Sequence, residues 1–181
     1  MFRSGNRSET LLAVLLILAG ASLRVLPHAW NVAPVSAIAL FAGVVLPRRL
    51  ALAVALGAMA LSDAVLGLHS LFLLTWGSFA LITLAAPRLL SGRAGFRAVV
   101  GASLAGSVFF FVVTNLGVFF VDGLYPMTVE GLGRCFWMAL PFFRNTLAGD
   151  LAYASAVYLI FVWAQARFRK PVAAEVRATA S

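Results

Sequence analysis

The chain has 181 residues, of which 62% are hydrophobic and 11% are charged, and its net charge is +8. A mean hydropathy of +0.99 excludes an ordinary soluble domain, because apolar runs long enough to cross a bilayer recur along the whole length. No long polar linker divides the chain. The sequence therefore predicts a single helical membrane domain at residues 1–170, followed by a disordered cytoplasmic tail at 171–181.

The apolar runs predict six membrane helices, at residues 10–26, 32–46, 50–68, 71–90, 97–121 and 144–166. The first two runs are short for a hydrocarbon core of about 30 Å, so we expect them to be broken or shielded by protein. Residues 122–143 contain a turn at 123–126, after which Thr128 is a candidate helix N-cap. The predicted fold is an all-α membrane protein, a compact bundle of six transmembrane helices with an extra interfacial helix on the outer face between helices five and six.

The basic residues are distributed unevenly between the two sides of the membrane. Six crossings with cytoplasmic termini place eleven of the 14 basic residues inside, and leave Arg24, Arg134 and Arg144 outside. This asymmetry follows the positive-inside rule. We therefore expect a multi-pass protein of the bacterial inner (cytoplasmic) membrane with both termini in the cytoplasm. The basic residues on the inner side would lie beside the anionic headgroups of the lipid bilayer, and no nucleic-acid partner is expected.

Polar residues gather near the outer ends of the predicted helices. Arg144, Asn145 and Asp150 enter the sixth helix, where a charge at bilayer depth costs at least ~2.5–3.5 kcal/mol and therefore faces a cavity or a partner. Thr146 and Asp150 share one helix face. This clustering predicts a polar pocket that is open to the outside. The candidate substrate-binding residues are Arg24, His28, Asn31, Asp63, His69, Asn115, Tyr125, Trp137, Arg144, Asn145 and Asp150.

Enzyme and metal signatures are absent from the sequence. It contains no HExxH, GxSxG or Walker A motif, and the two histidines are far apart. We therefore predict no catalytic residue, no metal site and no cofactor, and we do not expect an enzyme. Cys135 is expected to be a small apolar residue, although a role as a ligand to a substrate metal stays open. The small-residue pairs Ala39/Gly43 and Gly101/Ala105 serve either internal packing or docking of a membrane partner.

Several stretches resemble a bacterial inner-membrane family of unassigned function. They are NVAPVSAIALFAG (31–43), LSD (61–63), TNLG (114–117), GLYP (123–126) and PFFRNTLAGD (141–150), and the resemblance extends over residues 24–158. In size, helix number and small-residue faces, that family is similar to the substrate-binding S components of energy-coupling-factor (ECF) vitamin transporters. The resemblance implies binding of a vitamin-like or metal-related micronutrient from the outer face, with cobalamin as one candidate. It also implies a membrane partner subunit with ATPases.

Two functional hypotheses follow from these observations. In the first, the chain is a substrate-binding subunit for micronutrient uptake, in which Arg24 and Arg144 hold an anionic group or neutralise Asp63 and Asp150. In the second, it is a structural or assembly membrane protein whose outer polar residues form an internal hydrogen-bond network. The second hypothesis predicts a protein partner, and the first predicts a bound small molecule.

Overall fold

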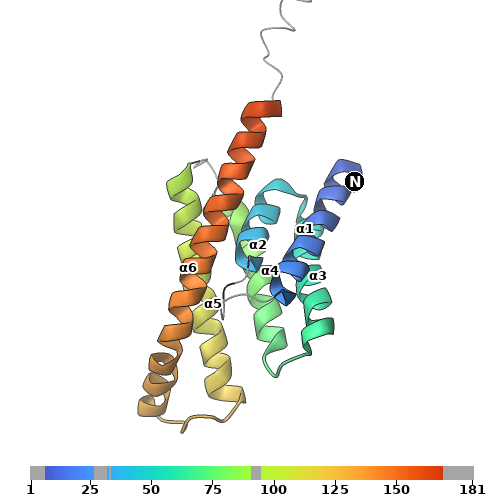
Figure 1. The fold of residues 1–181 in the computed structure, drawn as a ribbon. Coiled ribbons are helices and arrows are strands. Elements are labelled where there is room, and N and C mark those ends of the chain that lie inside the picture. Colours follow the sequence, from blue (N-terminus) through green and yellow to red (C-terminus); the bar gives the residue numbers. More distant parts are fainter. Residues whose placement is uncertain (1–6, 27–31, 33, 91–94, 169–181) are drawn as a thin grey trace, which may run out of the picture.

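The structure is a computed structural model that describes residues 7–26, 32, 34–90 and 95–168 (Figure 1). Within these residues the chain forms six α-helices and no strand, which confirms the expected all-helical class. The helices are α1 (Arg7–Val25), α2 (Val35–Val45), α3 (Arg48–Leu66), α4 (Phe72–Leu89), α5 (Phe96–Val121) and α6 (Val129–Phe168). The predicted tail at 171–181 lies outside the described residues.

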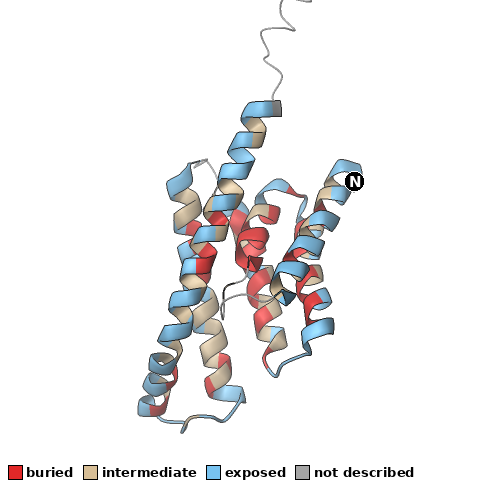
Figure 2. Cartoon of the chain, in the orientation of Figure 1, coloured by how far each residue is buried: buried red, intermediate tan, exposed pale blue. Residues whose placement is uncertain are grey.

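Every helix except α2 is long and apolar enough to cross a membrane. Large apolar side chains are exposed on the outward faces of these helices, among them Leu11, Val65, Leu73, Phe120 and Ile160. Figure 2 shows the same pattern, with buried residues where helices face one another and exposed residues around the outside. Apolar surface of this extent is stable against lipid but not against water. The chain therefore has the properties of a multi-pass membrane protein.

The short helix α2 lies at the centre of the bundle and contacts each of the other five helices (Figure 1). It has 11 residues, eight of them buried. Its length of about 17 Å is roughly half the thickness of the hydrocarbon core. The expectation that this short run is shielded by protein is confirmed. Around α2, the helices α1, α3, α4, α5 and α6 contact one another in that order, whereas the described parts of α1 and α6 do not touch.

Small residues bring α2 and α4 into close contact. A Cβ atom added at Gly43 would lie 2.3 Å from the carbonyl oxygen of Thr83 and 2.8 Å from Cβ of Ala86. Ala39, one turn before Gly43, is fully buried. The Ala39/Gly43 pair therefore serves internal packing. At Gly101, in contrast, an added Cβ would meet nothing within 4 Å among the described atoms.

The last helix, α6, is continuous over 40 residues. It is about 60 Å long, roughly twice the hydrocarbon thickness. The prediction of a separate interfacial helix ahead of a sixth helix starting at residue 144 is therefore wrong, because both segments belong to α6. Its first turn matches expectation, since Thr128 Oγ1 accepts a hydrogen bond from the backbone N–H of Gly131 at 3.1 Å.

Packing against α5 explains why α6 continues through Pro141. Phe111 of α5 contacts Phe136 at a ring distance of 5.5 Å and Phe143 at 4.4 Å. These two rings lie on either side of the proline, so α5 supports both halves of α6. Proline inside a membrane helix is tolerated where a neighbouring helix compensates in this way.

Candidate ligand-binding site

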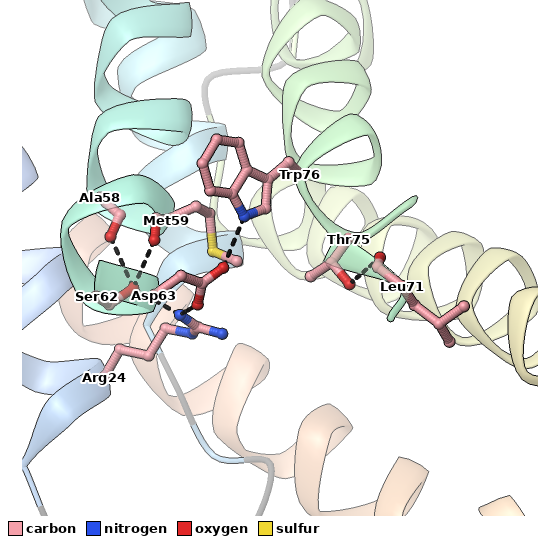
Figure 3. Close-up of polar contacts among 8 residues, drawn as sticks. All are labelled: Arg24, Ala58, Met59, Ser62, Asp63, Leu71, Thr75 and Trp76. Carbon is pink, nitrogen blue, oxygen red and sulfur yellow. Dashed lines mark hydrogen bonds and ion pairs between the residues drawn. The ribbon is translucent and has the colours of Figure 1, made fainter. Parts of the chain in front are cut away.

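The first polar centre surrounds Asp63 in the last turn of α3. Arg24, in the last turn of α1, forms an ion pair with Asp63 Oδ1 and donates to Ser62 Oγ at 2.6 Å. Trp76 of α4 donates from Nε1 to Asp63 Oδ2 at 2.8 Å. Figure 3 shows Arg24 and Trp76 reaching the carboxylate from two different helices. Asp63 is 2% exposed, and with both oxygens bonded it ties α1, α3 and α4 together.

The second polar centre surrounds Asp150, midway along α6 and also 2% exposed. Ser107 of α5 hydrogen-bonds Asp150 Oδ2 through its hydroxyl at 2.6 Å. Ser36, in the first turn of α2, hydrogen-bonds the same carboxyl group. Within the described ranges no arginine, lysine or histidine forms an ion pair with Asp150. The two buried aspartates therefore differ within the described part of the chain, because a cation balances the charge of Asp63, whereas the side-chain hydrogen bonds to Asp150 come from serine hydroxyl groups.

A third hydroxyl lies one helical turn from Ser107. Ser103 is 1% exposed, and its Oγ atom has no hydrogen-bond partner among the described residues. Two serines four residues apart thus occupy one face of α5, and one of them contacts the carboxyl group of Asp150.

A cavity of about 620 Å³ connects the two centres, because Arg24 and Asp150 both line it. Every one of the six helices contributes to its wall. The main apolar lining residues are Val35, Met59, Leu71, Phe79 and Phe110. The polar lining residues are Arg24, Ser36, His69, Thr75, Thr114, Thr146 and Asp150. The cavity lies toward the end of the bundle where α1 ends and α3 turns into α4, which we name the α3–α4 end.

Several predicted site residues meet at this cavity. Arg24, His69 and Asp150 line it, and Asp63 holds the guanidinium of Arg24 in place. His69 is an exposed residue of the turn between α3 and α4. The predicted residues His28 and Asn31 lie outside the described residues.

The other predicted residues lie elsewhere. Asn115 donates to the carbonyl oxygen of Phe111 at 2.7 Å and lines a smaller cavity of about 190 Å³ between α5 and α6. Tyr125 is half-buried in the turn between these helices. Exposed positions on α6 are occupied by Trp137, Arg144 and Asn145.

Among the described residues, Cys135 and the acidic residues form no metal site. Cys135 is buried, with its Sγ atom 3.5 Å from the backbone oxygen of Asn115. In the described ranges, no three side chains of histidine, cysteine, aspartate or glutamate come together in a way that could hold a metal ion.

Sequence reasoning missed the hydroxyl groups around Asp150. Ser36 and Ser107 lie in apolar runs on helices distant in sequence from α6, and a single serine in a membrane helix carries little information. The spacing of Ser103 and Ser107 at i and i+4 was the available signal, since it marks one polar face on an apolar helix. Thr75 in α4 was missed for the same reason.

Comparison with known proteins identifies a family. Residues 4–174 match the model of a family described as "Family of unknown function (DUF6580)". No curated protein and no solved structure matches the chain. The comparisons thus support membership of a family of unassigned function and add nothing on the similarity to ECF S components.

Proposed function

The chain belongs to the DUF6580 family, and we propose that it binds a small molecule in the cavity between its helices, as a substrate-binding membrane subunit for micronutrient uptake. The observation that carries this proposal is the cavity of about 620 Å³ walled by all six helices. Ligand pockets commonly measure roughly 300–1,000 Å³ and combine apolar walls with a few convergent polar groups. The mixture of apolar and polar lining residues described above has this character.

The different environments of the two buried aspartates support a binding role for Asp150. Ionisable residues inside membrane helices are costly and commonly functional. A structural role explains the burial of Asp63, because its two carboxylate oxygens bond to side chains of two neighbouring helices. Among the described residues, the hydrogen-bond partners of the Asp150 side chain are serine hydroxyl groups, and Asp150 lines the cavity. Its position therefore favours contact with a ligand.

The proposed direction of binding follows from charge. The positive-inside rule predicts that the α3–α4 end, and with it the cavity, lies on the outer side of the membrane. The sequence contains no nucleotide-binding motif. We therefore propose that delivery of a vitamin-like or metal-related ligand to the cytoplasm depends on a membrane partner subunit with ATPases.

Native mass spectrometry of the gently solubilised full-length protein tests the proposal. We expect a small molecule, distinct in mass from lipid and detergent, on the wild type. Thr146→Trp places a large ring at the cavity wall and should remove the bound molecule. Ala148→Trp is the matched control, because Ala148 is an exposed residue of the same helix outside the cavity lining. Wild-type protein without a bound small molecule, or equal retention in both variants, would contradict the proposal.

A second candidate function is a structural or assembly role in the membrane. The fully bonded carboxylate of Asp63 favours it, because that centre already joins three helices without any ligand. In this case the same spectra would show lipid or a protein partner on the wild type and no other small molecule. Both tryptophan variants would then carry the same partners as the wild type.

A further inference from the structure

We infer that the ligand presents hydrogen-bond donors to the cavity, and that it is an amine or another protonated nitrogen compound with an apolar body. This inference rests on the proposed function and names the ligand class of the same cavity. It differs from the sequence-based hypothesis that arginines hold an anionic group. Three features of the cavity wall support it.

The first feature is that the hydroxyl protons of three threonines in the cavity wall are already used in hydrogen bonds within their own helices. Thr75, Thr114 and Thr146 each donate to the carbonyl oxygen four residues earlier in their own helix, at 3.1, 2.8 and 3.2 Å. Figure 3 shows this bond for Thr75. A hydroxyl group has one proton and two acceptor lone pairs. With the proton committed to the helix, each threonine oxygen can offer only an acceptor to the cavity.

The second feature is the balance of charge. The positive charge of Arg24 is matched by Asp63, and its Nη1 atom already donates to Asp63 and Ser62. Asp150 has no such counter-ion in the described part of the chain. Among the described lining residues, the other basic side chain is that of His69, an exposed residue of the α3–α4 turn. A cationic ligand would therefore stabilise the ionised form of Asp150 and balance its charge, whereas an anionic ligand would meet an additional negative charge there.

The third feature is the aromatic part of the wall. Phe79 and Phe110 line the cavity with their rings stacked at a centroid distance of 5.0 Å. Aromatic faces attract a nearby cation in a desolvated site. They also pack against a flat apolar body. Acceptors, an unbalanced carboxyl group and aromatic rings thus all favour a nitrogen donor attached to an apolar ring or chain.

Three probes with the same ring and different charge test the inference on the purified full-length protein. Tryptamine carries an ammonium group, indole-3-acetate a carboxylate and 3-ethylindole no charge. Isothermal titration calorimetry should give a dissociation constant for tryptamine at least about tenfold lower than for the other two, as expected for one charge-assisted hydrogen bond.

Variants then assign the preference to the named side chains. Asp150→Asn should weaken tryptamine binding about tenfold or more and leave indole-3-acetate unaffected or bound more tightly. Glu130→Gln makes the same chemical change at an exposed position of the same helix and should have no effect. If Asp150→Asn does not fold, Thr114→Val removes one acceptor oxygen with little change of shape. It should weaken tryptamine binding by about threefold to tenfold.

The outcomes separate this inference from the proposed function. Tighter binding of indole-3-acetate, equal binding of 3-ethylindole, or binding of none of the probes would overturn the ligand class. Retained tryptamine binding in folded Asp150→Asn or Thr114→Val protein would overturn it as well. The proposed function is decided independently, by whether wild-type protein carries any small molecule that Thr146→Trp removes.

Discussion

Arg24 and Asp63 form an ion pair that joins the last turn of α1 to the last turn of α3, across 39 positions of sequence. The Arg24 side chain also lines the cavity. One interaction therefore both fastens α1 to the bundle and sets the position of a cationic group in the cavity wall. Under the proposed function, stability and ligand binding should therefore be coupled at this pair.

Replacing Asp63 by asparagine should destabilise the protein, because it leaves Arg24 without its counter-ion in a largely buried position. Breaking such a pair from one side costs about 3 kcal/mol of unfolding free energy. Titration of the detergent-solubilised protein with a denaturing detergent measures this loss. Glu130→Gln removes an exposed carboxylate and serves as the control. Equal unfolding free energies for Asp63→Asn and the wild type would show that the ion pair adds no stability.

Two serines on one face of α5 should respond differently to substitution by alanine. Ser107 hydrogen-bonds the buried carboxyl group of Asp150, so Ser107→Ala should cost about 1–2 kcal/mol of unfolding free energy. Ser103 has a buried hydroxyl without a described partner, so Ser103→Ala should be neutral or stabilise the protein by up to about 1 kcal/mol. The same unfolding titration measures both. A loss in Ser103→Ala as large as in Ser107→Ala would refute the hydrogen-bond assignment.

Hydropathy and small local signals predicted most of the fold. Apolar runs of membrane length identified α1, α3, α4 and α5 near their observed bounds, and the short second run predicted a helix shielded by protein. These features depend on neighbouring residues in the chain. The N-cap at Thr128 is local too, and it is present as expected.

The errors arose where distant segments decide the structure. The sequence predicted an interfacial helix before residue 144 and a separate sixth helix after it, but the two form one helix whose two halves both pack on Phe111 of α5. Asp63 and Asp150 were predicted as candidate binding residues, and both are buried between the helices. Their partners Trp76 and Ser107 depend on how helices are arranged around α2, which no local pattern reveals.

The orientation of the bundle can be tested by labelling introduced cysteines in cells. Leu68 and Pro47 are exposed residues at opposite ends of α3, and the native Cys135 is removed by Cys135→Ala to leave no other thiol. Leu68→Cys should react with a membrane-impermeant maleimide from outside the cytoplasmic membrane. Pro47→Cys should react only after the membrane is opened, because the positive-inside rule predicts that this end lies in the cytoplasm. The reverse pattern would invert the topology and the proposed direction of binding.

Two helix-interior glycines provide a matched test of the central packing. Gly43→Ala should destabilise the protein by about 1–3 kcal/mol, because a Cβ atom at this position overlaps the α4 backbone at Thr83 and α2 and α4 must move apart. Gly101→Ala should instead raise stability by about 0.5–1 kcal/mol, since alanine favours the helix and the added methyl group meets open space. Unfolding titrations of the two variants compare the same chemical change in two environments. Because α2 also carries Ser36 into the cavity wall, Gly43→Ala should in addition weaken any ligand bound beside Asp150, whereas Gly101→Ala should leave its affinity unchanged. Equal stability of the two variants would show that close contact between α2 and α4 does not hold the centre of the bundle together.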